Sequence, residues 1–407
     1  MSKSLYKLNL NLLNMIKINN LSDCTGCSAC ASICAKNAII MSEDREGFVY
    51  PKVDLDKCVD CGLCEKVCPV KNRDANSQNV HVMDFYAARN CDKDILFKSS
   101  SGGMFYALAK MIIKENGIVV GAKYDENLNV IHYIAESLDE CKQLMGSKYA
   151  QSKIGHIYKD IKQNLVKGRK VLFTGTPCQV HGLKLFLRKQ YPNLLCCDLV
   201  CHAVPSPLIF KDYKSYVEEL YHKRLKDISM RDKAKRGWSH DFSYVFNFVD
   251  GKRVRDSKKI ANWGKLFFSR FINRPSCYHC RYSNMDRVGD LTIADYWDDS
   301  HRRDDIYSKE GTSLVIINTE KGKSAWEQIN SNLLYWNLSE VDAIQPCLLR
   351  PTPEPEDRSV FWSFYFKYGF IKTYHKFFHV PYRKIVKKKI LDKLHIYKLV
   401  LLKYFKG

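Results

Sequence analysis

Two short cysteine runs near the amino terminus have the residue types and spacing of an iron–sulfur protein. Each follows the pattern Cys-x2-Cys-x2-Cys-x3-Cys, and the second continues into Pro69. The runs are Cys24, Cys27, Cys30, Cys34 and Cys58, Cys61, Cys64, Cys68. Three thiolates of such a run wrap around one 4Fe-4S cubane, and the fourth binds the cubane of the other run. The spacing therefore predicts a bacterial-type ferredoxin domain with two 4Fe-4S clusters over residues 15–76, and its chemistry is electron transfer.

This crossed pattern assigns four thiolates to each predicted cluster. One set is Cys24, Cys27, Cys30 and Cys68, and the other is Cys58, Cys61, Cys64 and Cys34. Zinc is the alternative, but zinc-binding cysteine pairs are usually separated by a longer finger and need no third cysteine two residues on. The first run departs from the bacterial pattern because Ala35 stands where proline is usual.

The remaining chain must form further domains. Its 407 residues far exceed a ferredoxin, and 45% hydrophobic with 12% aromatic residues is ordinary for a folded protein. Eight of the 17 cysteines lie in runs that require reduced thiolates, which indicates a reducing compartment. Residues 1–14 lack the features of a signal peptide, and no run approaches the roughly 18 apolar residues of a membrane span. We expect a cytoplasmic protein.

Positive charge is concentrated at the carboxyl end. The chain has a formal net charge of +21, and residues 365–407 hold eleven Lys and one Arg against a single acid, which leaves +11. We predict a basic amphipathic tail over 361–407. It could lie on an anionic membrane surface on the inner side or pack its apolar face on the protein itself, and the sequence leaves both open. No nucleic acid is expected as a partner, because no nucleic-acid-binding module accompanies the charge.

Polar, turn-rich residues 71–79 separate the ferredoxin from a mixed α and β region. Strands are expected near 85–88, 117–122, 130–134, 170–173, 194–201 and 242–248, and helices near 104–112, 154–165 and 180–187. The order strand, loop, helix, strand predicts an α/β layer, in which ligands gather at loops that follow the strands. Domains are predicted over 80–192 and 193–360.

Four further cysteines lie in turn-like settings and could bind a third cubane. They are Cys178, Cys201, Cys277 and Cys280. Isolated cysteines are more often buried small hydrophobic residues than ligands, so both interpretations stay open for these four. Five other cysteines are interpreted as buried small residues. They are Cys91, Cys141, Cys196, Cys197 and Cys347.

Several short motifs accompany the cysteine runs. They are Ser99-Ser100-Ser101-Gly102-Gly103, Gly146-Ser147-Lys148-Tyr149-Ala150-Gln151-Ser152, Thr174-Gly175-Thr176-Pro177-Cys178-Gln179, Cys201-His202, Cys277-x2-Cys280, Gly289-Asp290 and Asp295-Tyr296-Trp297. In this combination, residues 20–350 resemble the beta subunits of coenzyme F420-reducing hydrogenases and dehydrogenases, whose relatives include proteins of bacterial polysaccharide gene clusters. The chain departs from them at Ala203, where relatives often have glycine.

Members of that family bind FAD and iron–sulfur clusters, so the resemblance implies FAD and a third 4Fe-4S cluster at Cys178, Cys201, Cys277 and Cys280. It also implies that the serine–glycine loop, which opens a helix, holds the flavin pyrophosphate through backbone N–H groups. The implied flavin contacts are Ser100, Ser101, Gly102, Gly103, Lys148, Tyr149, Thr174, Gly175 and Thr176. Without the family, this loop is a helix cap with a tight turn, and Gln179 caps the next helix.

The predicted fold class is α+β: a ferredoxin-like domain with two 4Fe-4S clusters, a mixed α/β flavin-binding beta-subunit domain and a basic helical tail. The predicted function is an iron–sulfur flavoprotein oxidoreductase that passes electrons between a redox partner protein or reduced ferredoxin and an organic substrate or coenzyme. That substrate could be F420-like or a polysaccharide or lipid-linked precursor. The alternative is a non-catalytic electron-transfer subunit that docks on a catalytic partner. His202, Asp290 and Lys148 are candidate proton donors, but polar residues near loops more often satisfy backbone groups, so the structural interpretation is favoured for each and no catalytic residue is assigned.

Overall fold

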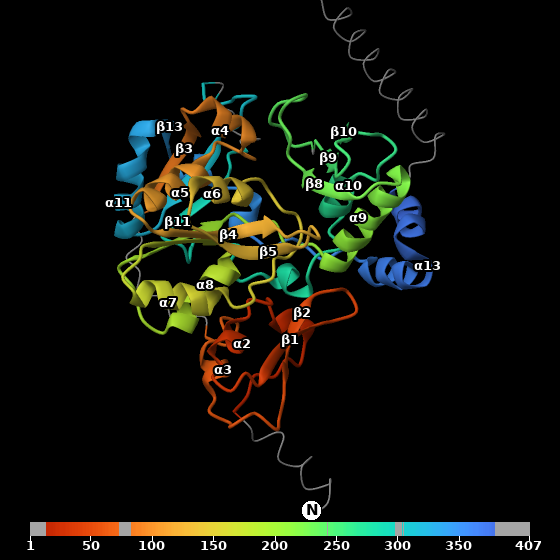
Figure 1. Ribbon diagram of the computed structural model, residues 1–407, viewed down its shortest axis with the longest axis horizontal. Helices are drawn as coiled ribbons and strands as arrows, with labels where there is room; N and C mark the ends of the chain where they lie inside the picture. Colours follow the sequence, from red (N-terminus) through yellow and green to blue (C-terminus); the bar gives the residue numbers. More distant parts are fainter. Residues whose placement is uncertain (1–13, 73–82, 242, 298–302, 304, 379–407) are drawn as a thin grey trace, which may run out of the picture. The chain divides into compact units, whose positions relative to one another are not determined.

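The computed structural model describes residues 14–72, 83–241, 243–297, 303 and 305–378. The chain divides into two compact units, Met1–Glu354 and Pro355–Gly407. The first unit contains a ferredoxin-like segment, an eight-stranded sheet with helices on both faces, and a separate three-stranded sheet (Figure 1). This is the mixed α and β fold that the sequence predicts.

The ferredoxin-like segment places short helices beside a two-stranded sheet. Its elements are η1 (Leu21–Asp23), α2 (Ala29–Ile33), β1 (Ile39–Glu43), β2 (Val49–Val53) and α3 (Leu63–Lys66). Strands β1 and β2 pair antiparallel, with Ile39 opposite Val53. Ser28 and Gly62 precede α2 and α3 with left-handed φ of 64° and 68°, so each cysteine loop turns sharply into its helix.

The large sheet has the strand order β13-β3-β12-β11-β7-β6-β4-β5. Its strands are β3 (Asp84–Asn90), β4 (Ile118–Tyr124), β5 (Val130–Ala135), β6 (Val171–Gly175), β7 (Leu194–Leu199), β11 (Leu291–Asp295), β12 (Ser313–Ile317) and β13 (Leu333–Leu338). Strands β4, β6, β7 and β11 are parallel. Strand β3 runs the same way, because β12 is antiparallel to both β3 and β11. The carboxyl ends of these five strands therefore share one edge, where ligands gather in α/β sheets.

Helices cover both faces of this sheet (Figure 1). One buried core contains residues of α5 (Met104–Lys114), α6 (Leu138–Leu144) and α11 (Glu320–Ile329). The other contains residues of α7 (Ile157–Val166) and α8 (Pro177–Leu187). Neighbouring strand residues alternate between the cores: Leu172 belongs to the first, whereas Val171 and Phe173 belong to the second. Burial on both faces explains the nearly continuous apolar strand sequences.

A smaller aromatic core lies between a helix and the three-stranded sheet. It is built from α9 (Pro207–Tyr221), β8 (Leu225–Ser229), β9 (Val245–Phe248), β10 (Arg253–Arg255) and α10 (Trp263–Ser269). The rings of Tyr213 and Trp263 have centroids 4.9 Å apart. The other short helices of the first unit are α4 (Lys93–Lys98), η3 (Pro275–His279), η4 (Asn330–Asn332), α12 (Glu340–Ala343) and η5 (Pro346–Leu348).

The predicted strands and helices are confirmed, with clearly shorter ends in three places. The helix predicted over 154–165 begins at Ile157. The strand predicted over 194–201 ends at Leu199, so Cys201 lies in the following loop, and the one predicted over 242–248 begins at Val245. Strands β6 and β7 are neighbours, so residues on both sides of the predicted 192/193 boundary contribute to one sheet.

The second unit contains α13 (Arg358–Phe378), which is interrupted by non-helical backbone at Gly369 with φ of 78°. No helix within the described ranges combines the length and apolarity needed to cross a bilayer. Residues 379–407, which hold most of the predicted basic tail, lie outside the described part of the chain.

Candidate electron-transfer site

The ferredoxin cysteines differ in exposure. Cys61 alone among these eight is exposed, whereas the buried ones are Cys24, Cys27, Cys30 and Cys64. The thiols of Cys24, Cys27, Cys30 and Cys68 interact electrostatically with one another, as the crossed pattern predicts, and Cys64 interacts with Cys58. We call Cys24, Cys27, Cys30 and Cys68 the inner set and Cys34, Cys58, Cys61 and Cys64 the outer set.

Burial raises the pKa of Cys24 and Cys30, and neighbouring thiols contribute in the same direction. Thiolates in this setting need a nearby positive charge, and a bound metal deprotonates its cysteine ligands outright. The chemistry of the inner set therefore fits an iron cluster.

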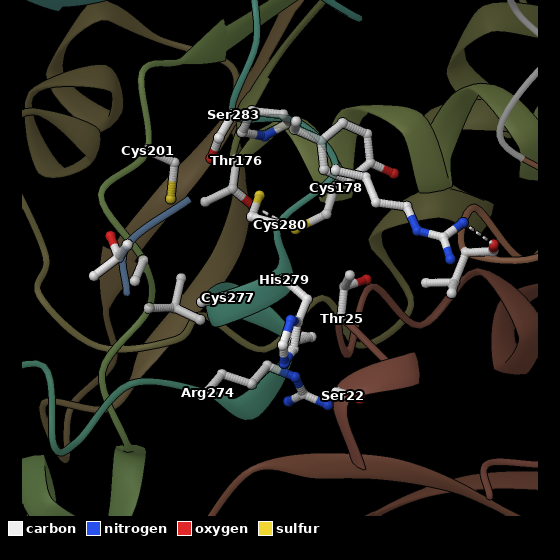
Figure 2. Close-up of a pocket in the computed structure, with 18 of the residues that line it drawn as sticks. Ser22, Thr25, Thr176, Cys178, Cys201, Arg274, Cys277, His279, Cys280 and Ser283 are labelled. Atoms are coloured by element: carbon white, nitrogen blue, oxygen red, sulfur yellow. Dashed lines mark hydrogen bonds between the residues drawn. The ribbon is translucent and has the colours of Figure 1, made fainter. Parts of the chain in front are cut away.

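The four loop cysteines line one cavity of about 350 Å³ (Figure 2). Cys178 lies in the first turn of α8, directly after β6, and Cys201 follows β7. Cys277 lies in η3 and Cys280 directly after it. We call these four residues the loop set; their thiols interact electrostatically with one another. The structure thus brings together the four cysteines that the sequence analysis groups.

The donors of the loop set fit a cubane. Burial raises the pKa of Cys178 to about 11 and that of Cys277 to about 12, so their thiolates also call for a cation. Within the described ranges, no three His, Cys, Asp or Glu side chains converge on a point where a single metal ion could be held. A cubane is a larger body that takes one thiolate at each of four irons.

The inner set and the loop set are neighbours. Thr25, which lies between two inner-set cysteines, lines the same cavity as the loop set. Cys27 interacts electrostatically with Cys178. Helix α8 carries Cys178 and, one turn later, Gly182, where an added Cβ would lie 3.0 Å from Cys27 Sγ. The ferredoxin segment therefore packs directly on the helix that presents the first loop cysteine.

His202 lines the cavity beside Cys201. Its Nδ1 lies 3.1 Å from Cys347 Sγ, and its carbonyl oxygen accepts a hydrogen bond from Thr352 Oγ1 at 2.7 Å. Burial lowers the pKa of His202. The predicted proton donor is thus held by structural contacts at the wall of the cavity.

The interpretation of five cysteines as buried small residues is right for three of them. Cys141, Cys196 and Cys197 are buried. Cys91 is exposed, because it directly follows β3 where the chain leaves the sheet, so the prediction is wrong there. Cys347 is only half-buried and contacts His202 instead of filling a core.

The predicted flavin loop lies at the same sheet edge as Cys178 and Cys201, because it follows β3 and α4. Its glycines allow a close approach to the sheet: a Cβ at Gly102 would lie 2.2 Å from Ala88 O, and Gly103 caps α5 with a φ of 82°. Ser100 Oγ accepts a hydrogen bond from Ser147 N at 2.7 Å. Two of the predicted flavin segments are thereby joined.

Residues with no sequence motif complete this region. Arg231 donates to Tyr149 Oη at 3.3 Å and forms an ion pair of 3.4 Å with Asp295. Trp238 Nε1 donates to Asp295 Oδ1 at 3.0 Å. Lys233 Nζ donates to the carbonyl oxygen of Ser101 at 2.6 Å. Asp295 belongs to a quoted motif, but nothing in the sequence singles out Arg231, Lys233 or Trp238.

Two candidate proton donors have structural roles. Lys148 Nζ donates to the carbonyl oxygens of Gln143, Leu144 and Met145 and so caps the end of α6, and burial lowers its pKa to about 7. Asp290 precedes β11, and its Oδ2 accepts a hydrogen bond from the backbone N–H of Cys196. Asp290 therefore lies at the amino end of β11, away from the edge that carries the loop cysteines.

The remaining predicted flavin contacts lie around the end of β6. Thr174 Oγ1 donates to Val120 O, and a Cβ at Gly175 would lie 3.2 Å from both Gln179 Oε1 and the Phe173 ring. Thr176 lines the cysteine cavity, and its backbone N–H donates to Gln179 Oε1 at 3.1 Å, which confirms the predicted cap.

Comparison with known proteins identifies the family. Two models of the coenzyme F420 hydrogenase/dehydrogenase beta subunit match this chain, the amino-terminal model over residues 85–158 and the carboxyl-terminal model over residues 168–341. This chain belongs to the family of coenzyme F420 hydrogenase/dehydrogenase beta subunits. The model of a 4Fe-4S dicluster domain matches residues 23–72, so this family member is an iron–sulfur electron-transfer protein of the oxidoreductase class.

Two curated relatives match this chain over more than 70% of its length. The F subunit of the F(420)H(2) dehydrogenase of Methanosarcina mazei is 21% identical over 312 residues, which cover 74% of this chain and 79% of the relative. Coenzyme F420-dependent sulfite reductase of Methanocaldococcus jannaschii is 27% identical over 306 residues, 72% of this chain. The match spans only 44% of the sulfite reductase.

Among solved structures, a chain of the F420-reducing [NiFe] hydrogenase complex from Methanosarcina barkeri matches with a TM-score of 0.42 and 20% identity. The match covers 64% of this chain and 83% of that one.

Proposed function

We propose that this family member holds three 4Fe-4S clusters and one FAD and passes electrons between a redox partner and an organic substrate or coenzyme. The observation that supports this most is the single cavity that the loop set and Thr25 of the ferredoxin segment line together. Iron–sulfur clusters transfer one electron at a time. A flavin can take up two such electrons together with a proton and pass them on as one hydride, or do the reverse.

The three cysteine sets differ in exposure. The outer set includes the exposed Cys61, three of the four inner-set cysteines are buried, and the loop-set cysteines are half-buried. Cys27 of the inner set interacts electrostatically with Cys178 of the loop set. The outer set is therefore the proposed contact point for a redox partner protein, and the loop set is the proposed connection to the carboxyl edge of the large sheet.

At that edge, the Ser100–Gly103 loop is the proposed pyrophosphate site of the flavin. The first N–H groups of α5 have no preceding turn to bond with, which suits an anion. The ammonium group of Lys233 lies directly behind the loop at Ser101 O, and Arg231 is held beside Tyr149. Arg231, and Lys233 while it is protonated, favour a negatively charged group at the loop.

Iron counting tests the third cluster. Anaerobically prepared full-length protein should contain about twelve irons and one FAD per chain, because three cubanes hold four irons each. Cys201→Ala and Cys277→Ala should each lower the iron content to about eight. The exposed Cys91→Ala is the matched control and should retain all of the iron. About eight irons in the wild type, unchanged in both loop variants, would contradict the third cluster.

The rival function is an electron-transfer subunit with no substrate of its own. In its favour, one relative is named as a subunit, and the chain spans less than half of the sulfite reductase that it matches. A stand-alone reductase should turn over with dithionite and oxidised coenzyme F420 in the absence of a second polypeptide. Cluster signals that reoxidise only when a separate protein is added would favour the subunit.

A contact with an anionic membrane surface is a second proposed property. Residues 365–407 have a net charge of +11, and the aromatic side chains of Phe366 and Tyr368 in α13 are 38% and 41% exposed. Aromatic and basic side chains together are typical of segments that lie at a lipid interface.

A further inference from the structure

Arg274 is a buried cation that connects the ferredoxin segment to the segment carrying Cys277. Its side chain is 1% exposed. Arg274 Nε donates to Cys24 O at 2.8 Å, and Nη2 donates to Val49 O at 3.0 Å. Its Nη1 donates to Gln151 Oε1 at 2.8 Å. Three directed hydrogen bonds therefore fix the plane and the position of the guanidinium group.

The ring contacts of Arg274 hold it from the ferredoxin side as well. The guanidinium carbon lies 4.3 Å from the centroid of the Tyr50 ring and 5.4 Å from that of Phe48. A Cβ at Gly26 would lie 2.8 Å from Arg274 Nη1, so the cysteine loop needs glycine there to make room for the guanidinium. The ferredoxin segment therefore contacts the Arg274 side chain through Phe48, Tyr50 and the Gly26 turn.

Arg274 has no carboxylate within ion-pair distance among the residues that the structure describes. Buried charges in proteins are normally paired, because removing an isolated charge from water is costly. The groups of opposite potential charge that face Arg274 are thiols: it interacts electrostatically with Cys24 on one side and with Cys178 and Cys277 on the other. Once iron deprotonates these thiols, their negative charge is the missing counter-charge.

We propose that Arg274 is a positioning residue that raises the reduction potentials of the two clusters beside it, the inner-set cluster and the loop-set cluster. The second half of this inference rests on the proposed third cluster. A reduced cluster carries one more electron, and a fixed positive charge stabilises it, so net charge nearby is one determinant of its potential. Arginine keeps its charge at every working pH, and burial removes the water and salt that would screen it.

Redox titration followed by electron paramagnetic resonance tests this on anaerobically prepared full-length protein. Arg274→Gln removes the charge, and Arg274→Met removes it while filling similar volume with apolar atoms. Both should lower the midpoint potentials of the inner-set and loop-set clusters and leave the outer-set cluster nearly unchanged. Arg274→Lys keeps the charge and should stay close to the wild type in potential, although it should melt at a lower temperature.

Lys153→Gln is the matched control. Lys153 also connects the two parts of the chain, through an ion pair of 2.8 Å with Glu43, but both side chains are about half exposed, at 52% and 54%. Removing this screened charge should shift no potential. Lower stability of the Arg274 variants with unchanged potentials would show that Arg274 is only a clamp and would overturn the inference.

Two further outcomes stay interpretable. If Arg274→Gln and Arg274→Met both fail to bind iron, Arg274→Lys provides the test. Midpoint potentials equal to those of the wild type support the role of charge, whereas a marked fall in the potentials of the inner-set and loop-set clusters overturns the inference. If the wild type proves to hold only two clusters, the proposed function loses its third cluster, but the shift of the inner-set signal in Arg274→Gln still tests the inference by itself.

Discussion

Lys233 is a buried cation whose ammonium group faces carbonyl oxygens. It donates to Leu96, Ser101 and Glu310 and so ties the predicted flavin loop to the segment before β12. Burial lowers its pKa to about 7, while the carboxylate of Asp295 opposes and the charge of Arg231 adds to that shift. The residue is therefore poised to lose its proton near neutral pH.

This shift predicts a pH dependence of stability. Because the pKa in the folded state lies below the unfolded value, the unfolded chain binds more protons between about pH 7 and 10, and Lys233 makes stability rise with pH in that window. Relative to Lys233→Met, the wild type should gain roughly 1 to 1.5 kcal/mol of unfolding free energy between pH 7 and 8.5. Denaturant unfolding of the wild type and Lys233→Met at both pH values measures this gain. An equal change of unfolding free energy with pH in the two proteins would refute the lowered pKa of Lys233.

Helix α8 is the element that connects the inner set to the loop set. It begins at the carboxyl end of β6 with a cap made by Thr176 and Gln179, which fixes Cys178 in its first turn. One turn on, the helix has glycine where it meets Cys27, and α2 contacts α8 along this surface. The close approach of the ferredoxin thus depends on the absence of a side chain at Gly182.

Gly182→Val tests that dependence. Its branched side chain must push into Cys27 and the hydroxyl group of Tyr158, so we expect a loss of about 1 to 3 kcal/mol of stability. Iron content should fall by up to about four atoms as the inner set is disturbed. Lys184→Val places the same side chain on the same helix at a half-buried position and should retain the iron. Full iron in both variants would mean that the contact tolerates a larger residue.

The same elements show what the sequence could predict. The position of Cys178 and Cys201 at one sheet edge could be predicted. Apolar runs predict β6 and β7, and two parallel strands bring the loops that follow them to the same edge. Arg274, Arg231 and Lys233 could not be predicted, because a single basic residue has no pattern, and its burial arises only from contacts between segments far apart in the chain. The position of Asp290 could not be predicted, because a short motif does not reveal on which end of its strand it lies.

Within the first unit, the ferredoxin segment contacts the rest of the unit at several positions. Besides the contacts at Gly26 and Gly182, the turn between β1 and β2 approaches α9 so closely that a Cβ at Gly47 would lie 2.7 Å from the backbone nitrogen of Leu208. Arg281 Nη1 donates to Val70 O at 2.8 Å near the other end of the segment. These contacts fix the inner set next to the loop set, which suits an internal electron path better than a tethered carrier.

The proposed membrane contact concerns the second unit, and charge alone makes it testable. Basic residues near an anionic surface contribute about 1 kcal/mol each. The full chain should therefore sediment with vesicles that contain anionic phospholipid and not with neutral phosphatidylcholine vesicles. A variant that ends at Phe378, and a full-length Lys384→Gln/Lys387→Gln/Lys388→Gln/Lys389→Gln variant, should both lose binding, the latter by on the order of a hundredfold or more.

The two variants separate charge from apolar contact in that test. Raising the salt concentration should release the wild type if charge dominates, because salt screens exposed charges. Equal iron content in all three proteins would show that the first unit is intact, so a loss of binding could be assigned to the carboxyl-terminal residues. If the truncated protein binds vesicles as well as the full chain does, the basic residues are instead a soluble face of the protein, and the redox partner becomes the better candidate to meet their charge.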